Sequence, residues 1–103
     1  MTNEKRLMNE IRVYCGEKGW VVVRANVGKV MMANGKWFDT GLPKGWPDLM
    51  ILTGNGHIMF CETKIHPNKP SPTQQKVLKR LRSLGYNAFV AYDLNEFKKK
   101  VIG

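Results

Sequence analysis

The sequence has few cysteines, few acidic residues and no long apolar run. Cys15 and Cys61 are its only cysteines, and they form neither a CxxC pair nor a zinc-binding spacing. We therefore expect two buried free thiols rather than a disulfide or a set of metal ligands. No apolar stretch approaches the length that spans a membrane, and the N-terminal MTNEKRLMNE lacks the apolar core of a signal peptide. These absences predict an intracellular, cytoplasmic protein without a membrane partner.

Acidic residues are outnumbered about two to one by basic ones. The chain has 17 Lys+Arg against 8 Asp+Glu, which gives a formal net charge of +9. In a small domain, such an excess favours a polyanionic partner, with nucleic acid the first candidate, over a charge that serves solubility alone. Because phosphate contacts weaken steeply with salt, the salt dependence of binding distinguishes the two interpretations.

The length and the apolar pattern predict a single α/β domain over residues 1–103. A hydrophobic content of 43% suits a compact domain, and we find no repeat, low-complexity tract or domain boundary. Helical spacing, β-branched runs and turn signals predict elements in a fixed order. These are a helix over 3–18, a strand over 20–27, a hairpin over 28–41, strands over 48–52 and 57–65, a helix over 72–84, a strand over 87–92 and a short helix from 93. The order predicts a mixed central sheet flanked by helices.

Further details of this prediction concern burial and the hairpin turn. The β-branched strand over 20–27 is expected to be buried, and the helix over 72–84 is expected to turn Val77, Leu78, Leu81 and Leu84 inward. Asn34-Gly35 is a strong signal for the hairpin turn. Trp37 and Phe38 beside that turn are interpreted as core or subunit-contact residues rather than as a base-stacking platform.

Two charged residues interrupt the apolar strand over 57–65, in the stretch FCETK. Glu62 and Lys64 lie two residues apart, so they share one face of the strand. A tight turn over 53–56 pairs this strand with 48–52, which brings Asp48 to the same end of the sheet. Converging carboxylates repel unless a cation lies between them, and hard oxygen ligands suit Mg²⁺ or Mn²⁺. The pattern indicates metal-assisted phosphodiester hydrolysis, with Lys64 orienting the attacking water or stabilising phosphate charge. The alternative is a structural ion pair between Glu62 and Lys64.

The segments around these residues resemble a known nuclease family. Pro47-Asp48 followed by Glu62-Thr63-Lys64 resembles the PD-(D/E)xK superfamily, and KGWPDLMIL, FCETK and SPTQQKVLKRLRSLGY together resemble its VRR-NUC branch. VVRANVG resembles the Arg-x-Asn-x-Gly segment of the same branch. The resemblance covers nearly the whole chain. It implies a restriction-endonuclease-like core and a metal-dependent DNA endonuclease in which Asp48, Glu62 and Lys64 are catalytic.

Two helical residues join the predicted site. Glu4 lies on the inward stripe of the first helix, and the resemblance implies a further metal ligand there, bound directly or through water. The alternative for Glu4 is a solvated carboxylate that the helix dipole favours. For Gln74, the resemblance implies a role near the active site, whereas Ser71 and Gln74 also fit a capping box. We expect that Gln74 does not easily serve both roles at once.

Three further residues are candidate DNA contacts. Arg24 and Asn26 share a face of the strand over 20–27, in the segment that resembles the family, and Lys44 lies in the loop before Asp48. We predict that Arg24 and Asn26 contact the substrate phosphate and that Lys44 contacts the DNA backbone. The alternative for all three is an ordinary solvated position.

The resemblance also implies a substrate. Small stand-alone members of the branch look like Holliday-junction resolvases of bacteria or phages, which implies branched DNA in a bacterial or phage-infected cell. Paired cuts across a four-way junction need two active sites, and one chain supplies one, so a homodimer is expected. The alternatives are a flap or nicking nuclease without junction preference, and a basic DNA-binding module whose carboxylates are only structural.

Overall fold

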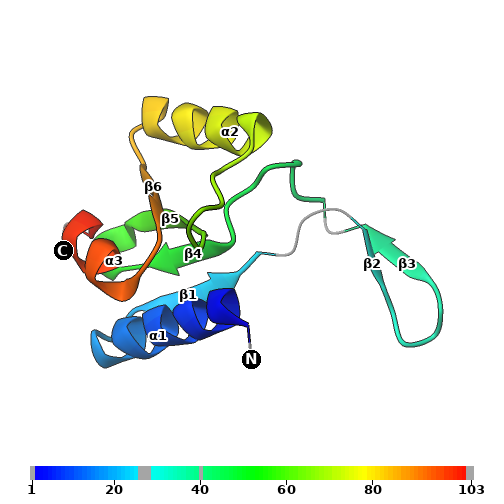
Figure 1. The fold of residues 1–103 in the computed structure, drawn as a ribbon, viewed down its shortest axis with the longest axis horizontal. Coiled ribbons are helices and arrows are strands. Elements are labelled where there is room, and N and C mark those ends of the chain that lie inside the picture. The colour runs from blue at the N-terminus through cyan, green and yellow to red at the C-terminus, as the bar shows by residue number, and fades with distance from the viewer. Residues whose placement is uncertain (1, 26–28, 40, 102–103) are drawn as a thin grey trace.

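The computed structural model describes residues 2–25, 29–39 and 41–101 and contains the predicted elements in the predicted order (Figure 1). In chain order these are α1 (Asn3–Glu17), β1 (Val21–Arg24), β2 (Lys29–Met31), β3 (Trp37–Asp39), β4 (Leu49–Leu52), the 3-10 turn η1 (Gly54–Gly56), β5 (Ile58–Thr63), α2 (Pro72–Ser83), β6 (Asn87–Ala91) and α3 (Leu94–Lys100). None of the helices in these ranges is long and apolar enough to cross a membrane.

Four strands form a mixed sheet in the order β1-β4-β5-β6. β4 pairs antiparallel with both β1 and β5, whereas β5 and β6 are parallel. Two parallel neighbours require a crossover, and α2 supplies it. Figure 1 shows α2 on one side of the sheet and α1 and α3 on the other. This arrangement confirms the predicted α/β fold class with a mixed sheet between helices.

Each helix begins where a side chain satisfies the first free backbone N–H groups. The hydroxyl of Thr2 accepts from the amide of Lys5 at 3.1 Å, and the carboxylate of Asp93 accepts from the amide of Glu96 at 2.7 Å. Ser71 caps α2 in the same way. These caps determine the residue at which each helix begins.

The sheet separates two apolar cores. The larger core lies against α1 and α3 and includes Ile11, Leu49 and Phe97. The smaller core lies against α2 and consists of Phe60, Leu78, Leu81 and Ala88. Cys15 and Cys61 are buried free thiols, as predicted, and burial raises the pKa of both.

Two predictions about burial are wrong. The strand over 20–27 was expected to be buried, but Val21 and Val23 of β1 are exposed because β1 is an edge strand that pairs only with β4. Leu84 was expected to face inward, but it is the C-cap residue of α2 and is exposed. The apolar side chains at these three positions therefore lie on the surface of the chain.

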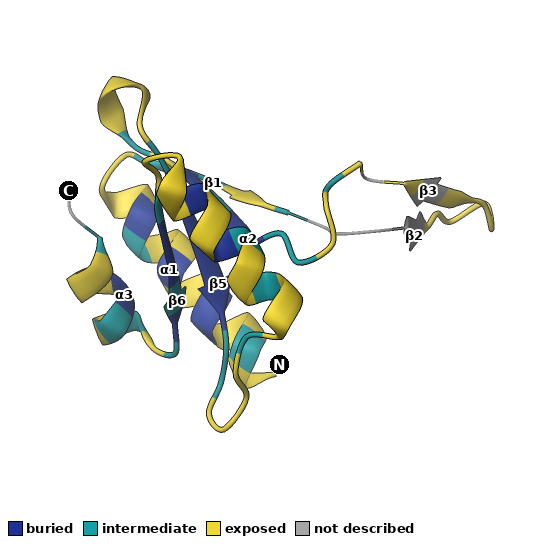
Figure 2. Cartoon of the chain, turned by 90° about the horizontal axis from the view of Figure 1, so that it is seen from above, coloured by how far each residue is buried: buried dark blue, intermediate teal, exposed yellow. Residues whose placement is uncertain are grey.

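The predicted hairpin is present as a separate two-stranded sheet of β2 and β3. Its turn contains Asn34-Gly35, with Gly35 at a φ of 83°, and the amide of Met32 donates to the carbonyl of Lys36 at 2.7 Å. Figures 1 and 2 show the hairpin projecting away from the main sheet. Trp37 is 62% exposed, so its interpretation as a core residue of this chain is wrong. The side chain of Phe38 lies outside the described residues.

Candidate active site

The register of β4 and β5 brings the predicted carboxylates together. Leu49 is paired with Cys61, so Asp48 and Glu62, one position further along, lie side by side at one end of the sheet. One oxygen of Asp48, Oδ2, accepts two hydrogen bonds from Thr63: from its backbone amide at 3.0 Å and from its hydroxyl at 2.8 Å. These contacts fix the orientation of the Asp48 carboxylate beside Glu62.

Glu62 is a buried carboxylate with an unsatisfied oxygen. The residue is 2% exposed, and its Oε2 atom has no hydrogen-bond partner among the described residues. The pKa of Glu62 is raised to about 8, first by burial and then by the charge of Asp48 and a hydrogen bond shared with it, while Lys64 opposes the shift. A carboxylate pair with one buried and one half-buried member is stabilised by a proton or by a cation.

Lys64 lies directly after β5, where its backbone amide donates to the carbonyl of Ala91 at 3.1 Å. Its ammonium nitrogen is 4.0 Å from Oε1 of Glu62, and the side chain is 20% exposed. The ion pair between Glu62 and Lys64, the alternative to a catalytic role, is therefore long. A lysine held this loosely, with part of its side chain in solvent, is free to contact an anionic group that approaches the site.

A cavity of about 310 Å³ adjoins Asp48. Its walls come from α1, β1, the loop before β4 and the start of α2, and they are formed by Met8, Arg24, Ala25, Gly45, Trp46, Asp48 and Gln74. The predicted DNA contact Arg24 thus lies at the same cavity as the predicted catalytic residues Asp48 and Gln74. The positively charged Arg24 and the Asp48 carboxylate therefore line one cavity. Binding of a phosphate beside a metal ion would need such a positive side chain.

Comparison with known proteins assigns the fold and the family. The family model of the VRR-NUC domain matches residues 5–93. The chain belongs to the VRR-NUC family. A solved structure described as a VRR_NUC domain superposes with a TM-score of 0.74 at 26% sequence identity, over 96% of this chain and 94% of that one. No curated protein matches significantly. Membership implies a nuclease-type function in DNA processing, in agreement with the resemblance noted from the motifs.

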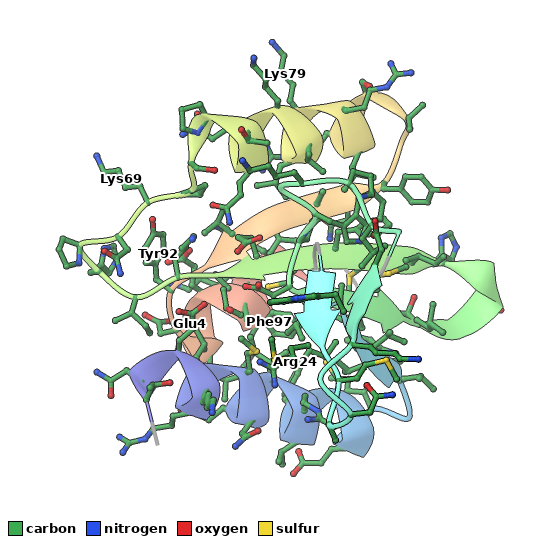
Figure 3. The ribbon with its side chains drawn as sticks, turned by 90° about the vertical axis from the view of Figure 1, so that its right-hand side faces the viewer. Glu4, Arg24, Lys69, Lys79, Tyr92 and Phe97 are labelled. Atoms are coloured by element: carbon green, nitrogen blue, oxygen red, sulfur yellow. The ribbon has the colours of Figure 1, made fainter. Side chains whose placement is uncertain are left out.

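Glu4 approaches the carboxylate pair of this VRR-NUC domain from α1. It is half-buried, its charge contributes to the raised pKa of Glu62, and Figure 3 shows it on the sheet side of α1. Its contribution is smaller than that of Asp48. No three His, Cys, Asp or Glu side chains within residues 2–25, 29–39 and 41–101 form a ready metal cluster. Glu4 also lies just outside the segment that the family model matches.

Gln74 completes the capping box and also contacts Glu62, although we expected that it would not easily do both. Its Oε1 accepts from the amide of Ser71 at 2.8 Å, and the Ser71 hydroxyl accepts from the amide of Gln74 at 3.1 Å, which completes the capping box. Its Nε2 donates to Oε1 of Glu62 at 3.4 Å. The two roles are compatible because the side-chain amide uses its oxygen for the cap and its nitrogen for the carboxylate.

The two other predicted DNA contacts are Lys44 and Asn26. Lys44 is exposed in the loop beside Gly45, and Asn26 lies outside the described residues. Sequence reasoning missed Thr63 and Trp46. Thr63 fixes Asp48, and no sequence signal marked it because strand alternation places it on the face opposite Glu62. Trp46 lines the cavity with a buried indole N–H that has no partner among the described residues, and the adjoining Pro47-Asp48 motif is the signal that would have drawn attention to it.

Gly45 holds the loop before β4 against α2, and its replacement by alanine should be more damaging than that of Gly41. Both residues have a positive φ, 87° and 77°, so both alanines are strained. A Cβ at Gly45 would also lie 2.9 Å from Cγ2 and 3.0 Å from the backbone of Thr73, whereas one at Gly41 would meet nothing within 4 Å. We expect Gly41→Ala to lower the free energy of unfolding by about 1 kcal/mol, and Gly45→Ala to lower it by about 1–2 kcal/mol more.

Chemical unfolding of the two variants tests this prediction. Gly41→Ala is the matched control because it shares the backbone strain without the close contact. Equal losses in the two variants would show that the contact between Gly45 and α2 does not constrain the loop.

Proposed function

We propose that this VRR-NUC domain is a Mg²⁺- or Mn²⁺-dependent endodeoxyribonuclease that cuts branched DNA, with the four-way junction as its preferred substrate. The observation that carries the proposal is the buried Oε2 of Glu62, which has no partner among the described residues and lies in a carboxylate placed beside Asp48. A divalent cation satisfies such a pair without protonating it.

Asp48 and Glu62 would hold the cation, and Glu4 would assist through a water molecule. The donor set fits, because carboxylate oxygens are the ligands that Mg²⁺ and Mn²⁺ prefer and Mg²⁺ retains several waters. A bound divalent ion would polarise the scissile phosphate and lower the pKa of a bound water. The cation assignment rests on the pairing of Asp48 with Glu62 and on the unpartnered Oε2 of Glu62.

The remaining side chains have separate roles in this proposal. Lys64 orients the attacking water or stabilises the charge that develops on the phosphate. Gln74 positions Glu62 through its Nε2, and Arg24 binds the phosphate that enters the cavity. Lys44 and Asn26 extend the contact along the DNA backbone. The net charge of +9 supports a partner whose binding is dominated by phosphates.

The proposed substrate and the oligomeric state are connected. A four-way junction is resolved by paired cuts on two strands, and each chain contributes one Asp48–Glu62 site. We therefore propose a homodimer that brings two sites to one junction. A flap or nicking nuclease needs no such pairing, and a DNA-binding module without catalysis needs no cation.

Cleavage of a panel of DNAs tests the function, with Lys64→Ala as the decisive variant. We expect Mg²⁺- or Mn²⁺-dependent cutting of a four-way junction that exceeds cutting of a flap or plain duplex. Lys64→Ala should reduce the rate by about 10²–10³-fold, the effect of removing one group that stabilises developing charge. Lys79→Ala is the control, since Lys79 points away from the body of the domain on the outer side of α2 (Figure 3).

Each other outcome has a defined meaning. Equal rates on junction, flap and duplex would leave a nuclease without junction preference. Metal-independent binding without any cleavage would leave the DNA-binding module. Normal cleavage by Lys64→Ala would remove Lys64 from the mechanism.

A further inference from the structure

We propose that the β2–β3 hairpin of one chain docks on the uncovered face of β1 and β4 of a second copy, and that this reciprocal contact builds the dimer. The inference rests on the homodimer of the proposed function and names the surfaces that form it. Both surfaces are apolar and exposed, and they are formed by different strands of the chain.

The hairpin is an apolar arm. Met31, Met32 and Trp37 are exposed, and β2 and β3 pair with each other without a substantial contact to another described element. A two-stranded hairpin of this size has little stability of its own. Exposed Trp and Met side chains are typical of the centre of protein interfaces. The arm therefore has the composition of a docking element.

The receiving face follows from the register of the main sheet. Val23, Met50, Phe60 and Ala88 form a row across all four strands on the side of α2. Exposure rises along that row, from 3% at Ala88 and 4% at Phe60 to 42% at Val23. The cause is that α2 packs over β5 and β6 and leaves the β1 half of the sheet without a cover.

A second row continues the uncovered face. Ile58, Leu52 and Val21 lie opposite one another on β5, β4 and β1. Ile58 is half-buried, whereas Leu52 and Val21 are exposed. Val21, Val23 and Leu52 thus form a continuous apolar surface, defined here as the β1–β4 face. In Figure 2 most of the described hairpin is coloured as exposed, while β5 and β6 contain buried residues.

The distribution of charged residues in the arm favours a protein partner over DNA. The segment over 29–39 contains two lysines and one aspartate, in a chain whose net charge is +9. An arm that binds DNA is expected to carry clustered Lys or Arg. Lys29 and Lys36 are seven residues apart rather than clustered, and the three residues that define the β1–β4 face are uncharged, so neither surface has the charge pattern of a DNA-binding arm.

A second copy is the partner that fits, because this chain itself carries both complementary surfaces. In a two-fold dimer each copy supplies one arm and one face, so the same contact forms twice. The hairpin projects away from the sheet of its own chain (Figure 1), so the face that it meets belongs to the other copy. Two contacts bury apolar surface that a single chain leaves in water.

Charge exchange between the two surfaces tests this contact. Trp37→Lys and Val23→Glu should each shift the protein toward monomer, weakening self-association by about tenfold or more, as expected for the loss of a central apolar contact. The chain with both substitutions, or an equimolar mixture of the two variants, should regain dimer through a Lys–Glu contact between copies. Val13→Ser is the control, because Val13 is an exposed apolar residue of α1 away from both surfaces. Light scattering and sedimentation over a concentration series measure the oligomeric state, and circular dichroism confirms folding of each variant.

Three results would overturn the proposal. The first is a wild-type protein that stays monomeric at high concentration, and the second is a dimer that both single variants leave intact. The third is the absence of recovery when the two charges are combined. The cleavage assay remains a separate measurement. A monomer that still cuts DNA would refute the arm exchange and the homodimer but not the nuclease activity, and a hairpin-dependent dimer that never cuts DNA would refute only the nuclease mechanism.

Discussion

Replacing Glu62 by glutamine is expected to abolish metal-dependent cleavage and to make the metal-free protein more stable at neutral pH. Cleavage should fall by about a thousandfold or more, because the substitution removes a charged ligand from the proposed cation site. Stability should rise because Glu62 is buried beside Asp48, and its ionised form is disfavoured by burial and by like charge. Glutamine has nearly the same shape without the charge, and its amide can donate to Asp48.

This opposition between activity and stability distinguishes a functional carboxylate from a structural one. If Glu62 served only an ion pair with Lys64, glutamine would lower stability or leave it unchanged. Thermal unfolding in the presence of a chelator, together with junction cleavage in Mg²⁺ or Mn²⁺, measures both effects. Glu10→Gln is the matched control, since Glu10 is an exposed carboxylate on α1. A Glu62→Gln protein that is less stable and still active would contradict the cation site.

The metal-free protein is expected to lose stability as the pH rises from about 4.5 to about 8. The pKa of Glu62 is raised from 4.5 to about 8 in the folded chain, first by burial and then by Asp48. Between these values the folded state keeps a proton that the unfolded state has released, so the free energy of unfolding falls with pH. Above about 8 both states are ionised and the decline ends. The expected change is on the order of a few kcal/mol.

Urea unfolding over a pH series measures this slope, and the difference between wild type and Glu62→Gln isolates the contribution of Glu62. Saturating Mn²⁺ should reverse the trend, because a ligand that binds only the folded state stabilises it and this one needs the ionised carboxylate. Glu4→Gln should weaken the Mn²⁺ effect less than Glu62→Gln does. Identical pH profiles for wild type and Glu62→Gln would show that Glu62 does not titrate as proposed.

The carboxylate pair could be predicted from the sequence because its geometry is local. A short turn between two strands sets their register, and the register places Asp48 beside Glu62. The helix stripe that located Glu4 and the turn signal at Asn34-Gly35 depend on spacing within a few residues in the same way. Features of this kind are contained in the order of the residues.

Thr63 and Gln74 mark the limit of that reasoning. Alternation along β5 directs Thr63 away from Glu62, but the end of the neighbouring strand brings Asp48 within reach of both its amide and its hydroxyl. The dual role of Gln74 depends on the packing of α2 against β5, which sets the distance between its amide and Glu62. Sequence spacing carries no information on such distances between elements.

The sequence by itself determined the elements, their order, the family and the pairing of Asp48 with Glu62. Only the tertiary structure decided which apolar surfaces are covered. Val21 and Val23 have the composition of a buried strand, and Trp37 that of a core residue, yet all three are exposed. The reason is physical: burial depends on where non-local partners lie, and here α2 covers β5 and β6 while β1 stays at the edge of the sheet.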